Sequence, residues 1–199
     1  MVAAKKQIKQ ENLLAQGVQL LMQQGYHGTG LKEILDAVQI PKGSFYNYFP
    51  SKESFAAEVI QHYIQPFLDQ LQRHLNTPDT DALTALCNYF NELIAELEAT
   101  QFKGGCLLGN LMGEIGDTSD LCQQSLRLAV DKYQRLLAVA LKTAQTEGTV
   151  RLDKSADEMA DLLLNTWQGA LLRMKIEQSS APLKQCCEVL LQDYFIQRC

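Results

Sequence analysis

The sequence contains no long hydrophobic run. No stretch of about 18 consecutive apolar residues, the minimum for a transmembrane helix, occurs among the 199 positions. The first ten residues, MVAAKKQIKQ, also lack the apolar segment of a signal peptide. These two absences exclude a membrane-spanning helix and predict a soluble cytoplasmic protein that has no membrane partner.

Proline is scarce, and no segment shows the alternation of apolar and polar residues that is typical of a β-strand. The chain has only 5 prolines, and Leu, Ala, Gln and Glu, which favour helices, are abundant. A chain of this length can bury a proper hydrophobic core in one or two domains. We therefore expect an all-α protein of about nine helices.

Patterns that would indicate catalysis or metal binding are also missing. The 3 histidines are scattered, and there is neither a nucleophile elbow nor a glycine-rich phosphate loop. None of the 6 cysteines has the CxxC or Cys/His spacing of a zinc site, and in the cytoplasm thiols stay reduced. We expect no metal, no cofactor and no enzymatic activity; an all-helical enzyme is an alternative without support.

The formal net charge of −5 is unusual for a protein that binds nucleic acid, but the charge is unevenly distributed. Residues 1–55 contain six lysines and four acidic residues, so this part carries +2 and the remainder carries −7. Electrostatic forces act over only about 8–10 Å at physiological salt, so local charge decides contact with phosphates. The acidic remainder therefore does not exclude DNA binding by the N-terminal part.

The most informative segment is residues 41–52, PKGSFYNYFPSK. Pro41 suits the first position of a helix, and helical spacing places Phe45, Tyr48 and Phe49 on one apolar face. Residues 30–38 have apolar side chains at positions i, i+3, i+4 and i+7, and only a short turn separates them from Pro41. Two short helices joined this tightly predict a helix-turn-helix whose second helix reads DNA.

Residues 8–55 resemble the N-terminal DNA-binding domain of the TetR family of bacterial transcriptional repressors. The resemblance rests on Gly25-Tyr26, Thr29, Leu31, Ile34, Ile40, Lys42-Gly43-Ser44-Phe45-Tyr46, Tyr48-Phe49 and Ser51-Lys52-Glu53. It implies that double-stranded operator DNA is contacted by Thr29, Lys42, Gly43, Tyr46, Asn47, Tyr48 and Lys52. Gln39 stands where the family often has glycine, so it is expected to adopt a less favoured backbone conformation.

We expect two domains: residues 1–51, a three-helix DNA-binding domain, and residues 52–199, a larger helical domain for effector binding and dimerisation. The expected helices cover residues 8–24 and 30–38, one to two turns that begin near residue 41, and then residues 52–75, 80–99, 107–115, 120–146, 155–177 and 182–198. Pro66 lies inside the fourth and predicts a bend or break near residues 62–65. This bend could serve as a hinge or could have no function.

The last two helices have more apolar surface than one buried face needs. The resemblance implies that they pair with their copies in a second chain as a four-helix bundle, and the candidate interface residues are Leu163, Gly169, Ala170, Leu183, Cys187, Leu190, Leu191 and Tyr194. A two-fold dimer would place two reading helices about 34–36 Å apart, or somewhat more, on a palindromic operator.

Cys106 is the candidate sensor residue. It follows Lys103-Gly104-Gly105 and opens an apolar helix, and a thiol at a helix N-terminus near a cation tends to be reactive. The alternative is a small packed side chain. Residues 104–117 resemble a segment of one C-terminal class of TetR-type regulators, which includes the repressor of N-ethylmaleimide reductase. This implies sensing of an electrophile or oxidant. Separately, Arg173 and Lys175 of the eighth predicted helix are candidate cationic neighbours of the thiol.

The other candidate effector is a reversible apolar small molecule. Its pocket would be lined by Phe90, Phe102, Met112, Tyr133, Trp167 and Met174, although such side chains at helical spacing are also typical of plain core. The sequence thus predicts a dimeric repressor of the TetR type that an effector or thiol modification releases from DNA. The alternative is a helical interaction module without DNA-binding activity.

Overall fold

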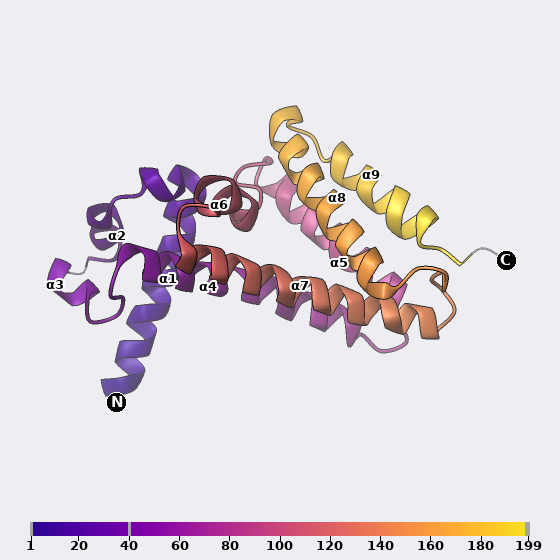
Figure 1. Cartoon of the computed structure of the whole chain (residues 1–199), viewed down its shortest axis with the longest axis horizontal. Coiled ribbons are helices and arrows are strands. Elements are labelled where there is room, and N and C mark those ends of the chain that lie inside the picture. Colours follow the sequence, from indigo (N-terminus) through magenta and orange to yellow (C-terminus); the bar gives the residue numbers. More distant parts are fainter. Residues whose placement is uncertain (1, 40, 198–199) are drawn as a thin grey trace. The chain divides into compact units, whose positions relative to one another are not determined.

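The computed structural model describes residues 2–39 and 41–197, except for the side chains of residues 2–6 and 42. Over these residues the fold consists of α-helices with one π-helical turn and no β-strand (Figure 1). The helices are α1 (Val2–Gly28), α2 (Leu31–Val38), α3 (Lys42–Phe45), α4 (Lys52–Leu75), α5 (Ala82–Ala99), α6 (Leu107–Ile115), α7 (Asp120–Thr146), α8 (Ala156–Glu177) and α9 (Ala181–Val189). The predicted all-α class is confirmed, and no described helix is long and apolar enough to cross a membrane.

Side-chain caps and a glycine set several of the helix ends. Ser51 accepts a hydrogen bond from the Ser54 N–H at the start of α4, and Ser155 with Glu158 forms a capping box at the start of α8. The cap of α5 is Asp81, whose carboxylate accepts from the Thr84 N–H at 2.9 Å, so α5 begins at Ala82 and not at residue 80. Gly148, with φ 76°, follows the end of α7 in a left-handed conformation.

The last predicted helix is shorter than expected. α9 ends at Val189, and the chain continues as the π-helical turn η1 (Leu190–Tyr194). After this turn Val150 and Ile196 form an isolated antiparallel bridge, and the Arg151 N–H donates to the Phe195 carbonyl at 2.9 Å. The bridge ties the C-terminal end of the described chain to the connection between α7 and α8.

The chain divides into two compact units, the first of which comprises residues 1–66 and 106–130. It contains α1, α2, α3, α6 and the N-terminal parts of α4 and α7, and α1 packs against both α2 and α6. α4 contacts α7, because Ser125 Oγ donates to the Ala57 carbonyl at 2.6 Å. α6 therefore belongs to the same unit as the predicted helix-turn-helix.

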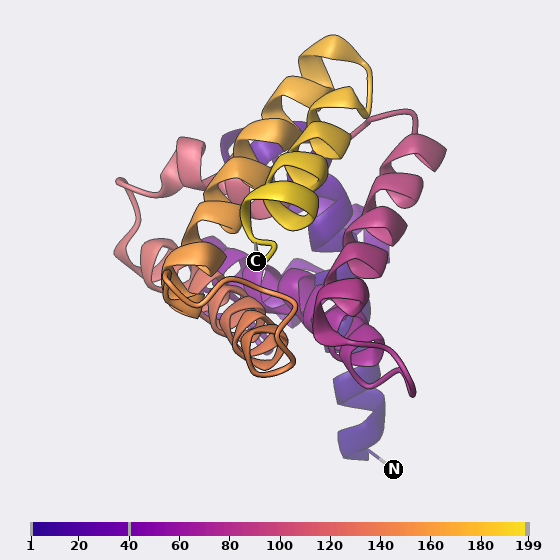
Figure 2. The ribbon, with the colours of Figure 1, turned by 90° about the vertical axis from the view of Figure 1, so that its right-hand side faces the viewer.

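The second unit comprises residues 67–105 and 131–199. In it α8 and α9 lie side by side (Figure 1, Figure 2), and α5 contacts α9. Glu98 on α5 accepts hydrogen bonds from Ser180 Oγ at 2.5 Å and from Lys184 Nζ at 2.8 Å. Two elements, α4 and α7, contribute residues to both units.

The boundary between the units in α4 follows Pro66. α4 nevertheless remains helical from Lys52 to Leu75, so the proline does not break it. The structure groups the first turns of α4 with the N-terminal helices. The predicted domain boundary after residue 51 stays a prediction.

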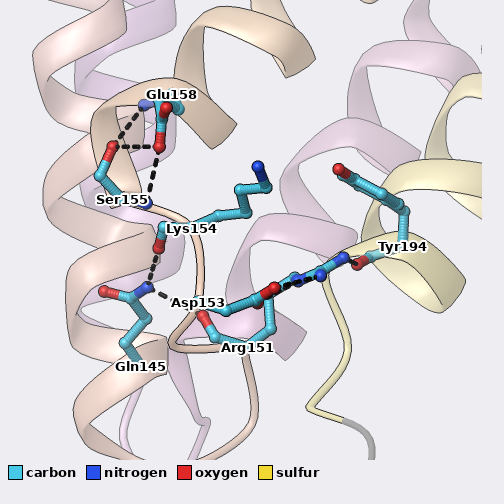
Figure 3. Close-up of polar contacts among 7 residues, drawn as sticks. All are labelled: Gln145, Arg151, Asp153, Lys154, Ser155, Glu158 and Tyr194. Carbon is cyan, nitrogen blue, oxygen red and sulfur yellow. Dashed lines mark hydrogen bonds and ion pairs between the residues drawn. The ribbon is translucent and has the colours of Figure 1, made fainter.

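Polar side chains fix the connection between α7 and α8 (Figure 3). Gln145 donates to the carbonyls of Arg151 and Lys154 at 2.9 and 2.8 Å. Arg151 pairs with both carboxylate oxygens of Asp153 at 2.6 Å and donates to the Tyr194 carbonyl at 3.1 Å. These bonds hold the connection against both the end of α7 and η1.

Candidate nucleic-acid interface

The turn between α2 and α3 has the geometry of a helix C-cap. Gln39 is left-handed, with φ 54° and ψ 43°, and its N–H donates to the carbonyls of Leu35 and Asp36. The less favoured conformation predicted for Gln39 is therefore confirmed. Ile40, which follows, lies outside the described residues.

The inner face of the α3 segment is a cluster of three phenylalanine rings. Phe45 and Phe49 are fully buried against Phe55 of α4. The ring centroids lie 5.3 Å apart for Phe45 and Phe49, 5.6 Å for Phe45 and Phe55, and 5.0 Å for Phe49 and Phe55. These distances are typical of favourable aromatic pairs, so the cluster fixes the orientation of α3.

The outer face of the α3 segment presents polar groups to solvent. Tyr46 is 52% exposed, and Asn47 and Gly43 are also exposed. A Cβ atom at Gly43 would meet nothing within 4 Å, so a DNA backbone can approach closely there. The Lys42 side chain lies outside the described residues. The hydroxyl and amide on this face are suited to hydrogen bonds with phosphates or base edges.

Two of the predicted DNA contacts have partners inside the protein. Thr29 is fully buried, and its hydroxyl donates to the Gly25 carbonyl at 2.6 Å, so its side chain is not exposed in this structure and its contact with DNA stays a prediction. Lys52 Nζ donates to the Tyr26 carbonyl at 2.6 Å and lies 4.2 Å from the centroid of the Tyr26 ring. Burial lowers the pKa of Lys52, although the negative charges of Glu114 and Glu33 oppose this effect. Tyr48 is half-buried.

The segment that Lys52 contacts lies just beyond residue 24, where the first helix was expected to end. Gly25 has φ 73° and ψ 179°, a conformation open essentially only to glycine, and residues 26–28 continue α1 beyond it. Glu114 of α6 accepts hydrogen bonds from the N–H groups of Tyr26 at 2.7 Å and His27 at 2.6 Å. The sequence analysis did not identify Glu114. Its position in the sequence could have indicated a special role, because Glu114 is the one charged residue among the nine of α6.

Cys106 occupies the position expected of a sensor at a helix start. It is the N-cap of α6, is half-buried, and follows Gly104 and Gly105, whose φ angles are 85° and 74°. A Cβ atom at Gly105 would lie 2.9 Å from Lys175 Cδ, so the Lys175 side chain crosses the backbone of the residue before Cys106. Of the two predicted cationic neighbours, Lys175 thus lies against this loop, whereas Arg173 pairs with Glu177.

The structure brings some of the predicted effector residues together. The centroids of the Phe90 and Trp167 rings lie 4.8 Å apart. The Tyr133 hydroxyl is 2.9 Å from the hydroxyl of Tyr89, a residue that the sequence analysis did not identify. Met174 is buried, Phe102 is half-buried, and Met112 is an exposed residue of α6 in the first unit. Two surface clefts of about 560 and 720 Å³ instead lie around the α7–α8 connection.

Most of the predicted dimer residues are core residues of the single chain. The side chains that are buried within it are Leu163, Ala170, Leu183, Cys187, Leu190 and Leu191. Gly169 and Tyr194 are exposed, as an interface requires. The outward apolar side chains of α8 are Leu162, Leu172 and Ile176, which with Gly169 follow helical spacing; we call these four residues the α8 outer face.

Two family models match the sequence. Residues 13–59 match the bacterial regulatory proteins of the tetR family, and residues 82–190 match the tetracyclin repressor-like C-terminal domain. The first match covers α1 from residue 13 onward, α2, α3 and the start of α4, and the second covers α5 to α9. Both halves of the chain are therefore matched in the order found in that family.

Individual relatives agree with the family models. The chain is 35% identical to the HTH-type transcriptional repressor DhaR of Mycobacterium sp. strain GP1, covering 92% of this chain and 90% of DhaR. It is 32% identical to the repressor NemR of Escherichia coli K12, covering 87% of each. The crystal structure of a regulatory protein TetR from Rhodobacter sphaeroides superposes with a TM-score of 0.84 at 30% identity, over 92% of this chain and 97% of that one. The reduced form of E. coli NemR does so with a TM-score of 0.83 at 28% identity, over 94% and 96%. The chain therefore belongs to the TetR family of DNA-binding transcriptional regulators.

Proposed function

We propose that this protein is a dimeric repressor that binds a palindromic operator through α3 and is released when the Cys106 thiol is modified. The observation that carries the DNA-binding part is the two-sided α3 segment. Its buried side is locked by Phe45 and Phe49, and its exposed side presents Tyr46 and Asn47. A reading helix needs this combination, because base contacts require side chains that are exposed and also held in a fixed orientation.

Operator binding is tested with a duplex that the wild-type protein selects from a random-sequence library. Lys42→Ala is expected to raise Kd about tenfold and to reduce the salt dependence by about one phosphate contact. Lys142→Ala, on the exposed surface of α7, is the matched control and should leave Kd unchanged. If the wild type selects no sequence, or Lys42→Ala equals the control, the protein is an interaction module without operator binding.

The dimer is proposed to form through the α8 outer face. In the single chain Leu172 is 56% and Ile176 is 83% exposed, which is unusual for such large apolar side chains. Gly169 lies between them and Leu162, and a Cβ atom there would meet nothing within 4 Å. A second helix could approach closely at this glycine and cover the three apolar side chains.

Release is proposed to begin with the addition of an electrophile to Cys106. With N-ethylmaleimide, the sulfur forms a bond to one alkene carbon and the thiol proton ends on the neighbouring carbon, so no group leaves. The adduct replaces a half-buried side chain at the N-cap of α6 with a much larger one. Because Gly105 is tightly bordered by Lys175, the adduct would displace this loop and the start of α6.

A gel-shift titration with N-ethylmaleimide tests the thiol. The wild type is expected to release the selected duplex after modification, whereas Cys106→Ser should stay bound. Cys87→Ser is the control: Cys87 is also half-buried, but burial raises the pKa of its thiol, so it should react slowly. Release of Cys106→Ser at the wild-type rate would reject the thiol mechanism.

A reversible apolar effector remains the second candidate, and the buried Tyr89 and Tyr133 hydroxyl pair supports it. The two hydroxyls are 2.9 Å apart beside the Phe90 and Trp167 rings, so a ligand with one polar atom could bind there by displacing this packing. Tyr133→Phe would then change the response to a hydrophobic compound, and Cys106→Ser would not.

A further inference from the structure

The segment at the end of α1 is held from two sides by opposite charges. The Glu114 carboxylate accepts from the N–H groups of Tyr26 and His27, at 2.7 and 2.6 Å. The Lys52 ammonium donates to the Tyr26 carbonyl at 2.6 Å. The N–H of Tyr26 thus binds an anion, and its carbonyl binds a cation. Both are charge-assisted hydrogen bonds, which are stronger than bonds between neutral groups.

The Glu114 carboxylate is packed closely against the backbone of α1 at Gly25. A Cβ atom at Gly25 would lie 2.6 Å from Glu114 Oε2, so the carboxylate lies almost against the α1 backbone. Gly25 also accepts the hydrogen bond of the buried Thr29 hydroxyl, one residue before the N-cap of α2. Three side chains, from α6, α4 and the α1–α2 link, therefore bind the main chain of the same three residues, 25–27.

This segment sets the direction in which the helix-turn-helix leaves α1. α2 begins at Leu31, immediately after it, and α3 follows after the Gln39 turn. Gly25 is outside the regular helical conformation, so α1 itself does not dictate that direction. The hydrogen bonds of Glu114 and Lys52 supply the constraint that the helix lacks.

We propose that Glu114 is a positioning residue for operator binding, because its two hydrogen bonds to Tyr26 and His27 hold the start of the helix-turn-helix in the orientation that fits DNA. The inference rests on operator binding by this protein. It does not depend on the effector. Glu114 itself touches no DNA, and it acts through the main chain of α1.

The sign of the effect distinguishes this role from simple electrostatics. Glu114 is an acidic residue in the DNA-binding unit, so removal of its charge alone would reduce repulsion from phosphates and strengthen binding. Loss of the positioning bonds would instead weaken binding. The number of phosphate contacts would not change, so the salt dependence should stay as in the wild type.

The experiment compares Glu114→Ala, Glu114→Gln and Asp117→Asn on the selected duplex. Asp117 is exposed just after α6, so its variant removes a similar charge without touching α1. We expect Kd to rise about tenfold or more for Glu114→Ala and less for Glu114→Gln, which keeps one acceptor oxygen; the salt slope should be unchanged. Asp117→Asn should bind as well as the wild type or slightly better.

Amide hydrogen exchange gives the second readout. In Glu114→Ala the amides of Tyr26 and His27 should exchange faster, while those of α4 keep their protection. The inference is overturned if Glu114→Ala binds like Asp117→Asn, if its salt slope falls, or if the two amides keep their protection. Failure of the wild type to bind any duplex would instead reject the proposed function, so the two failures are distinguishable.

Discussion

At the scale of single residues, two glycines differ in backbone conformation and in the space around them. Gly25 combines a positive φ angle with a close approach of Glu114, whereas Gly113 on α6 has open space around it. Gly113 lies inside the predicted helix 107–115, whereas Gly25 directly follows the predicted first helix, which was expected to end at residue 24. Only Gly25 occupies a conformation that another residue cannot adopt without strain.

Gly25→Ala should therefore lower the free energy of unfolding by about 1–3 kcal/mol. Gly113→Ala is the matched control and should raise it by about 0.5–1 kcal/mol, because alanine favours a helix interior over glycine. Chemical denaturation followed by circular dichroism measures both. Equal effects of the two substitutions would contradict the conformation assigned to Gly25.

The adjacent cysteines of α9 make a prediction about pH. Burial raises the pKa of Cys186 to about 11 and that of Cys187 to about 12, whereas an unfolded thiol ionises near pH 8.5. Below about pH 8.5 both thiols are protonated in both states, so their contribution to stability is fully present. As the pH rises above this value the unfolded chain loses protons first, and stability falls until the folded pKa is passed.

Denaturant unfolding between pH 8 and pH 10.5 should show this loss. Each thiol should lower the free energy of unfolding by up to about 1 kcal/mol per pH unit above pH 9. Cys187→Ala should have a shallower pH dependence than the wild type, whatever its absolute stability. An identical pH dependence for both proteins would show that Cys187 ionises readily in the folded state.

At the scale of elements, α3 is too short to be stable by itself. Four residues make a single helical turn, and isolated helices of that length do not persist in water. Its position comes from packing, since Phe45 and Phe49 contact Phe55 at the start of α4. The buried and exposed sides of the segment should therefore respond differently to mutation.

Tyr46→Ala should weaken operator binding about tenfold with little change in stability, because the ring is 52% exposed. Phe49→Leu should lower the free energy of unfolding by about 1 kcal/mol and weaken binding as well, because α3 loses part of its support. Operator titration and thermal unfolding of the same samples test both. A large loss of stability in Tyr46→Ala would indicate that its ring is part of the core.

At the scale of the whole molecule, the proposed dimer depends on the α8 outer face. Leu172→Asp with Ile176→Asp should shift the protein from dimer to monomer in analytical ultracentrifugation and should abolish tight operator binding. Leu152→Asp is the control, since Leu152 is also exposed and apolar but lies in the α7–α8 connection. Dimers that persist in the double variant would place the interface elsewhere.

Much of this protein is determined by its sequence alone. Periodicity, caps and glycines predicted the helices at 52–75, 107–115 and 120–146 with the bounds that the structure shows. The pattern PKGSFYNYFPSK predicted which α3 side chains are buried and which are exposed. These features are local, because they depend on the spacing of neighbouring residues along one helix.

The tertiary structure decided the features that depend on packing between distant segments. Leu163, Leu183 and Leu191 are apolar residues of the kind found in interfaces, but they are buried within their own chain. Helical spacing cannot distinguish a residue that faces its own core from one that faces a partner. Thr29 and Lys52 match a DNA-binding motif, yet Gly25 and Tyr26 provide them with internal partners. Glu114 lies 88 positions from Tyr26, so only the folded chain reveals that its carboxylate meets the α1 main chain.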